Sequence, residues 1–192
     1  MSTRSSFSDT VSSAASHLEF SNSDRCLMSG TAGPPMLPGV YNNNMQLFLA
    51  ENYVAIYVEM IHTVRIIPLD GRAGLTPAIR QFSGDGRGYW DGDTLVIETA
   101  NFNDDTDYAG TSRATWRSTS PNMKLVERFS RTDADTLLYE FTVDDPDTWE
   151  RSWSAELPMH RQELGIFEFA CHEGNYGLPN ILSGNRVSEA AG

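Results

Sequence analysis

The sequence predicts an all-β fold, in which an antiparallel meander closes into a small barrel with one or two short helices. Short runs of alternating apolar and polar residues predict the strands, and brief turns rich in Asp, Asn and Gly separate these runs. A meander of this kind covers its edges best by closing into a barrel. With about eight or nine strands, the barrel is just wide enough inside for one small ligand.

The N-terminal region divides into a tail and a covering segment. Residues 1–24 are rich in Ser and show no apolar period, so we expect a flexible tail. Residues 25–192 then form a single β-barrel domain, long enough to bury a substantial core. Within it, Gly30–Pro38 contains several prolines, which favour an extended segment over helix or strand.

The sequence of the first half of the domain predicts two strands, followed by a third strand or an extension of the second. Met45–Ala50 and Tyr53–Met60 flank a polar turn, and His62–Leu69 is a third strand or the continuation of the second. Alternate residues from Val54 to Ile66 are almost purely aliphatic, so this run has one apolar face. The other face carries aromatic residues and a charge pair.

A short helix and a hairpin follow. Thr76–Pro77 has the form of an N-cap with proline in the first turn, which predicts a short helix that reaches Phe82 and ends at Gly84. Asp91–Gly92 is the strongest hairpin signal in the chain. It joins the predicted strands Arg87–Trp90 and Thr94–Phe102.

The second half is a regular series of strands after a long loop. Asn103–Asn122 is polar, and loops of this length often lie over a binding site. A short terminal helix is expected over Gly177–Val187. The predicted strands are Lys124–Arg131, Thr136–Val143, Trp149–Met159 and a last one from Ile166 to His172.

Composition excludes several classes of function. The chain has a net charge of −12 with only 14 Lys and Arg spread along it, so nucleic-acid binding is disfavoured. No apolar run suits a secretion signal or a membrane span, and we therefore expect a cytoplasmic protein without membrane contact. Cys26 and Cys171 are too few for a disulfide framework. The sequence does not decide whether the two form a single disulfide bridge, which a reducing compartment disfavours.

The candidate catalytic residues centre on the stretch Ile166–Gly177. In a strand Glu168 and His172 point the same way, and His172 ends the strand beside polar turn residues, so it is either a reachable acid-base group or a cap of the turn. If the barrel has a polar interior, buried carboxylates there have shifted pKa values suited to proton transfer. The residues placed there are Glu59, Arg65, Glu127, Glu140 and Glu168; for Glu127 and Arg128 a structural ion pair is favoured. The four predicted catalytic residues are His172, Glu168, Glu59 and Arg65.

Aromatic side chains supply candidate walls for an apolar or aromatic ligand, although core packing is their ordinary use. His62 lies on the aliphatic face, where a buried histidine with one hydrogen bond is favoured over a ligand contact. Metal, nucleotide and Ser-nucleophile motifs are absent, so we expect no metal and no cofactor. The candidate binding residues are Tyr57, His62, Trp149, Trp153, Asn175 and Tyr176.

Four segments together resemble a family of largely uncharacterised bacterial proteins: Gly88–Val96, Glu127–Leu137, Phe141–Pro146 and Cys171–Gly177. The resemblance covers most of Cys26 to Gly184 and implies a lipocalin-like small barrel, without supplying catalytic residues. The Ser-rich start is more similar to a cytosolic fungal protein than to the exported bacterial members. Some small fungal proteins of natural-product pathways are cofactor-free cyclases, including hetero-Diels–Alderases, and this chain is expected to be similar to those.

Two functions are therefore expected from the sequence. The first is a cofactor-independent cyclase or isomerase of natural-product biosynthesis, acting on an apolar small molecule inside the barrel. The alternative is a carrier that binds a small hydrophobic ligand without chemistry, since small barrels serve both uses. The one protein partner considered is a second copy of the chain, and the sequence does not decide whether such a homodimer forms.

Overall fold

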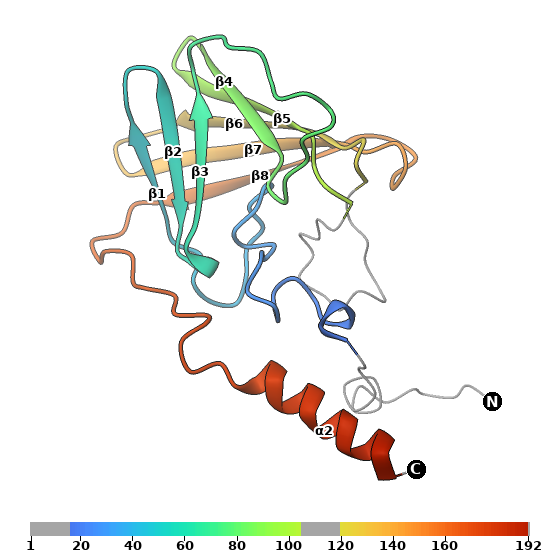
Figure 1. The fold of residues 1–192 in the computed structure, drawn as a ribbon. Helices are drawn as coiled ribbons and strands as arrows, with labels where there is room; N and C mark the ends of the chain where they lie inside the picture. Colours follow the sequence, from blue (N-terminus) through green and yellow to red (C-terminus); the bar gives the residue numbers. More distant parts are fainter. Residues whose placement is uncertain (1–15, 105–119, 192) are drawn as a thin grey trace, which may run out of the picture.

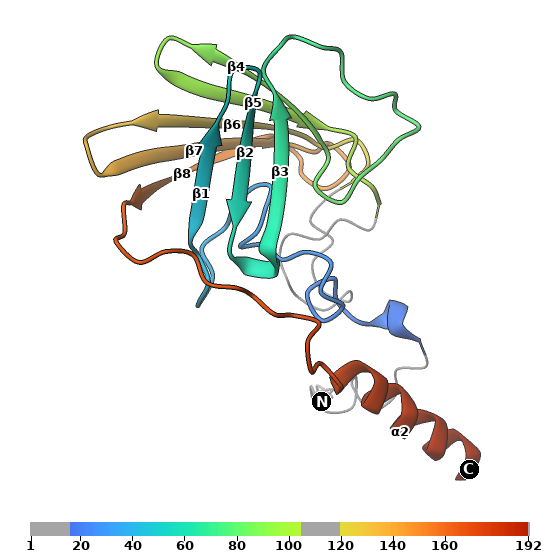
Figure 2. The same cartoon turned by 60° about the vertical axis from the view of Figure 1, so that its left-hand side comes forward.

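The computed structural model describes residues 16–104 and 120–191, and this part of the chain is mostly antiparallel β-structure, as predicted. Its strands form two sheets, ordered β1-β2-β3 and β4-β5-β6-β7-β8. The three-stranded sheet lies across one face of the five-stranded sheet, with the strands of the two sheets crossing (Figures 1 and 2). The strands are β1 (Met45–Leu49), β2 (Tyr53–Val58), β3 (Thr63–Pro68), β4 (Asp85–Asp91), β5 (Thr94–Ala100), β6 (Lys124–Arg131), β7 (Thr136–Asp144) and β8 (Trp153–His160).

The core lies between the sheets because each sheet has one apolar face. Successive side chains of a strand point to opposite faces, so every second residue is buried along β2, along most of β6 and in the second half of β7, as the alternation predicted. Buried residues from the two sheets belong to one apolar cluster, and the space between the sheets is therefore filled by side chains. The inward side chains include Val54, Ile56 and Val58 from one sheet and Leu95, Ile97, Leu125, Phe129, Tyr139, Phe141 and Val143 from the other.

The junction of β2 and β3 differs from the predicted unbroken aliphatic face. A 3-10 turn, η2 (Met60–His62), separates two antiparallel strands, and Ile61 within it has a φ of 57°. The turn changes the phase of the alternation, so Arg65 is buried whereas Val64 and Ile66 are 55% and 58% exposed. A left-handed conformation at a β-branched residue is rare, and no hydrophobic period encodes it.

Of the other predicted elements, some are confirmed and some are wrong. The Asp91–Gly92 hairpin is confirmed, and β6 and β7 begin where predicted. β8 begins at Trp153, later than the predicted start at Trp149. The predicted helix over Thr76–Phe82 is wrong: residues 77–78 form a turn, and Ile79 is half exposed with no apolar face to cover. Most of the predicted loop Asn103–Asn122 lies outside the described residues.

The last predicted strand, from Ile166 to His172, is also wrong. This stretch belongs to an extended segment of residues 161–176, here called the strap, which runs from β8 to the helix α2 (Gly177–Ala191) (Figure 1). A strand needs a ladder partner, and within the described residues the strap pairs with no strand. Phe169 and Cys171 pack against the core instead. The predicted terminal helix is confirmed and extends beyond Val187. In the described ranges, no helix has the length and apolar character needed to cross a bilayer.

Part of the predicted tail packs onto the domain. Ser21 and Asn22 are buried, while residues before 16 lie outside the described part. Cys26 and Cys171, whose pairing the sequence left open, form a disulfide with their Cα atoms 5.9 Å apart. The bridge ties the N-terminal segment to the strap.

Glycines of the run Gly84–Gly88, which lacks the features of a nucleotide loop, allow close packing at the start of β4. A Cβ atom on Gly84 would lie 2.6 Å from Thr99 Cγ2 and 2.8 Å from the carbonyl oxygen of Ala100. Gly84 also has a φ of +65°, which L side chains rarely adopt. Only glycine therefore fits this position without a shift of the backbone.

We expect Gly84→Ala to lower the free energy of unfolding by about 2–4 kcal/mol, from a strained φ and overpacking together. Gly71→Ala is the matched control, because Gly71 has a φ of +73° but no atom within 4 Å of its added Cβ. It should cost only the conformational part, about 1–2 kcal/mol. Urea unfolding measures both; equal losses would show that packing at Gly84 contributes nothing.

Candidate functional site

A pocket of about 790 Å³ lies where the two sheets leave an open edge, between β1 and β8. We call it the edge pocket. Its two strand walls come from β1 and from β7 with β8, and its two coil walls are residues 31–38 and 161–166. Its volume falls in the range typical of small-molecule sites.

The floor of the edge pocket is apolar. Every second residue of β8 faces the core side, and at this end of the strand no opposing strand covers these residues. The methionines among the floor residues are flexible and fit irregular apolar surfaces. The floor residues are Met36, Leu37, Met45, Leu137, Leu157 and Met159.

The rim of the pocket is polar and carries charges of both signs. The Thr136 hydroxyl lies 3.2 Å from Nδ1 of His160. Arg161 and Asp135 form a long ion pair of 3.7 Å, and both side chains are 69% exposed. Arg131 donates from Nη1 to the carbonyl oxygen of Ala134 at 3.0 Å. The pocket thus combines an apolar floor with hydrogen-bonding and charged groups at its mouth, the composition of a site for an amphiphilic molecule.

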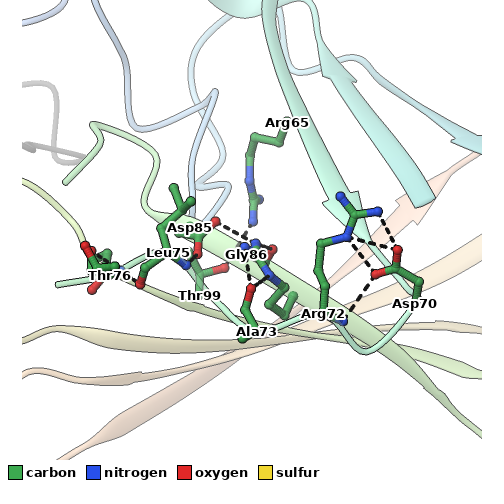
Figure 3. Close-up of polar contacts among 11 residues, drawn as sticks. Arg65, Asp70, Arg72, Ala73, Leu75, Thr76, Asp85, Gly86 and Thr99 are labelled. Atoms are coloured by element: carbon green, nitrogen blue, oxygen red, sulfur yellow. Dashed lines mark hydrogen bonds and ion pairs between the residues drawn. The ribbon is translucent and has the colours of Figure 1, made fainter. Parts of the chain in front are cut away.

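A separate polar cluster lies buried between the sheets. Glu127 on β6 accepts two hydrogen bonds from Arg65 on β3, one of them 3.0 Å long, and a third of 2.8 Å from the hydroxyl of Tyr139 on β7. The Tyr139 hydroxyl in turn accepts from the backbone N–H of Met36 at 3.1 Å. Arg65 points from β3 towards Thr99 on β5 (Figure 3). These contacts connect both sheets and the N-terminal segment.

The pKa shifts in this cluster favour a structural role. Burial and then the negative charge of Glu127 raise the pKa of Tyr139 well above its ordinary value, so its hydroxyl stays neutral and donates. Burial lowers the pKa of Arg65, but the attraction of Glu127 outweighs it, and the net direction is upward. Both groups therefore hold their protons. Glu127 is paired as predicted but with Arg65, whereas Arg128 pairs with Asp91 on the surface.

The four predicted catalytic residues do not meet in one place, and none of them lines the edge pocket. Arg65 belongs to the buried cluster. Glu59 is buried at the end of β2, where the side-chain amides of Asn42 and Asn44 donate to its carboxylate. Glu168 and His172 are exposed on the strap. Since the strap is not a strand, these two side chains lack the shared face that the sequence predicted.

The six predicted binding residues are also dispersed. Tyr57 is half-buried on β2, and Tyr176 is 71% exposed. His62 is exposed rather than buried, and its Nδ1 lies 3.0 Å from the carbonyl oxygen of Phe169. Asn175 donates to the carbonyl oxygen of Cys171 at 3.2 Å. The first contact joins the strap to η2 and the second lies within the strap, so the two form no common pocket.

Trp149 and Trp153, the remaining two, form an aromatic pair. Their rings meet edge to face with centroids 6.0 Å apart, and Trp153 meets Phe141 in the same way. Both indole Nε1 atoms are buried without an acceptor in the described part of the chain. Trp153 starts β8, whereas the edge pocket lies at the strand's other end, so this pair packs against the core away from the pocket.

Sequence reasoning missed the residues that line the edge pocket. Arg131 and His160 both lie at strand ends, and Arg161 follows His160 directly. The available signal was that basic or titratable residues end or directly follow two predicted strands of an acidic chain, and that the alternate residues of these strands are apolar. It was overlooked because Ile166–Gly177 concentrates more titratable groups in one stretch.

Fold and site together define a class: an antiparallel two-sheet protein with a pocket at its open edge. Among the described residues, no group of three or more His, Cys, Asp or Glu side chains is placed to hold a metal ion. Comparison with protein-family models, with curated proteins and with solved structures found no match.

Proposed function

We propose that this protein binds a small, mainly apolar molecule in the edge pocket, as a carrier does. The single observation that carries this proposal is the pocket itself: apolar side chains form its floor, and polar groups surround its mouth. In this proposal the two sheets act as the halves of a lipocalin-like barrel that is open between β1 and β8. The ligand lies at this opening, because the space between the sheets is already filled by the core.

Binding is favoured over catalysis because the predicted acid-base groups are spread over the molecule. A general acid or base must lie within hydrogen-bond reach of the reacting atoms, or one water away. Arg65 and Glu59 are buried and hydrogen-bonded to neighbouring side chains, and His172 lies on the exposed strap. A carrier needs only apolar walls and a few polar contacts, and the edge pocket has both.

Ala134→Trp tests the proposal, because Ala134 lies at the pocket but outside the core. We expect the indole to occupy the pocket and to weaken binding of a fluorescent probe with an apolar ring system and one sulfonate, 1-anilinonaphthalene-8-sulfonate, about tenfold or more. The matched control is Ala73→Trp, an exposed alanine outside the pocket whose carbonyl also accepts from an arginine, Arg87. Equal probe affinities of the two variants would contradict the proposal.

A cofactor-independent cyclase or isomerase, such as a hetero-Diels–Alderase, is the second candidate function. It is supported by three residues with titratable side chains, Asp135, His160 and Glu163, which are among those that line the same pocket. Incubation with an ortho-quinone methide and an alkene distinguishes the two functions: catalysis gives an excess of one stereoisomer, and His160→Ala abolishes it. A racemic product formed at the uncatalysed rate would mean that the protein binds without catalysing this reaction.

A further inference from the structure

The charges at the edge pocket contrast with those of the whole chain. The chain has 26 acidic residues against 14 Lys and Arg, yet the pocket is lined by two arginines, Arg131 and Arg161, and by two acidic residues, Asp135 and Glu163. Its lining is therefore formally neutral in a protein with a net charge of −12. An anionic ligand that is repelled by most of this surface meets cations here.

Arg131 is the better placed of the two cations. Among residues 16–104 and 120–191, no carboxylate forms an ion pair with it, and its one hydrogen bond goes from Nη1 to the carbonyl oxygen of Ala134. The other N–H groups of its guanidinium stay available, and their fork geometry matches a carboxylate. Because the side chain is exposed, a ligand can reach it from the mouth of the pocket.

Arg161 can contribute as well, because its ion pair with Asp135 is weak. The pair is 3.7 Å long, and both side chains are 69% exposed, so water screens it. The backbone N–H of Arg161 donates to the carbonyl oxygen of Asp135 at 2.7 Å, which fixes the main chain beside the rim while the side chain remains accessible.

We propose that the ligand of the edge pocket carries a carboxylate on an apolar body, with the carboxylate at Arg131 and Arg161 and the body on the floor around Leu157 and Met159. This inference rests on the proposed function, since it names the chemical class that the same pocket binds. A doubly charged phosphate is disfavoured, because Asp135 and Glu163 lie on the same rim and repel additional negative charge.

The test compares three ligands that share one alkyl chain: dodecanoate, 1-dodecanol and dodecyl phosphate, each titrated by calorimetry at about pH 8, where the carboxylic acid is ionised. We expect dodecanoate to bind about tenfold or more tightly than dodecanol, the size of a charge-assisted hydrogen bond. Arg131→Gln should remove most of this difference by weakening dodecanoate alone. The matched control, Arg151→Gln, removes an exposed arginine outside the pocket and should change neither affinity.

Each other outcome has a definite meaning. If dodecanol binds as tightly as dodecanoate, or if Arg131→Gln and Arg151→Gln behave alike, the carboxylate assignment is overturned while the pocket stands as an apolar site. If dodecyl phosphate binds most tightly, the anion is of another kind and the assignment is again overturned. If none of the three ligands binds to the unaltered protein, the proposed function fails together with this inference.

Discussion

Glu127→Ala is expected to lower the free energy of unfolding by about 3–5 kcal/mol, the usual loss when one partner of a buried ion pair is removed. The change leaves the guanidinium of Arg65, which is 5% exposed, without its carboxylate. It also removes the acceptor of the Tyr139 hydroxyl, which is fully buried. Urea unfolding followed by tryptophan fluorescence measures the loss.

Arg128→Ala is the matched control for this prediction, because Arg128 is the next residue along β6 and faces the opposite side of the sheet. Its ion pair with Asp91 is exposed, and exposed pairs contribute little to stability. A second variant, Arg65→Met with Glu127→Leu, removes both charges and should recover much of the lost stability. Equal losses for Glu127→Ala and Arg128→Ala would contradict a structural role for the buried cluster.

The sequence predicted the strands of the five-stranded sheet well, because their information is local. A period of two places Leu125, Glu127 and Phe129 on one face, and the turn residues Asp91–Gly92 bring β4 and β5 together. The same reasoning failed at Ile61 and His62, where two consecutive residues with a positive φ change the phase of the following strand. Arg65 is inside because Glu127 receives it, and this partner lies on a strand of the other sheet.

The candidate site could not be predicted from neighbours in sequence, because its walls come from parts of the chain that are far apart. The pocket forms only when the two sheets pack with the free edges of β1 and β8 at the same opening. This packing brings together residues near Met36, Met45, Leu137 and His160. The stretch Ile166–Gly177 attracted attention by composition, but its alternation reflects contacts of an extended strap. Without a ladder partner, titratable side chains on such a segment point to solvent.

The disulfide has a further consequence for the pocket. Cys26 lies shortly before the coil wall of residues 31–38, and Cys171 shortly after the wall of residues 161–166. The bridge therefore restrains both coil walls of the edge pocket. Disulfides persist mainly in oxidising compartments, whereas the cytoplasmic location expected from the sequence stays a prediction.

Removing the bridge is expected to have the largest effect of all the proposed changes. The cysteines are 145 residues apart in sequence. A bridge that closes a loop of this length lowers the conformational entropy of the unfolded chain, which raises the free energy of unfolding by up to about 5 kcal/mol in the entropic account. Cys26→Ser with Cys171→Ser should therefore lower the free energy of unfolding substantially, and it should weaken probe binding in the edge pocket because both coil walls become freer to move.

The measurement is urea unfolding and probe titration of the unaltered protein and the double serine variant, each with and without dithiothreitol. Reductant should lower both stability and probe affinity of the unaltered protein to the values of the variant, and should leave the variant unchanged. The variant controls for any effect of reductant itself, because it has no thiol left. If oxidised and reduced protein unfold at the same urea concentration, the bridge does not restrain the fold. If stability falls while probe affinity stays the same, the coil walls are held by their contacts, such as that of His62 with Phe169, and the disulfide stabilises the domain without shaping its pocket.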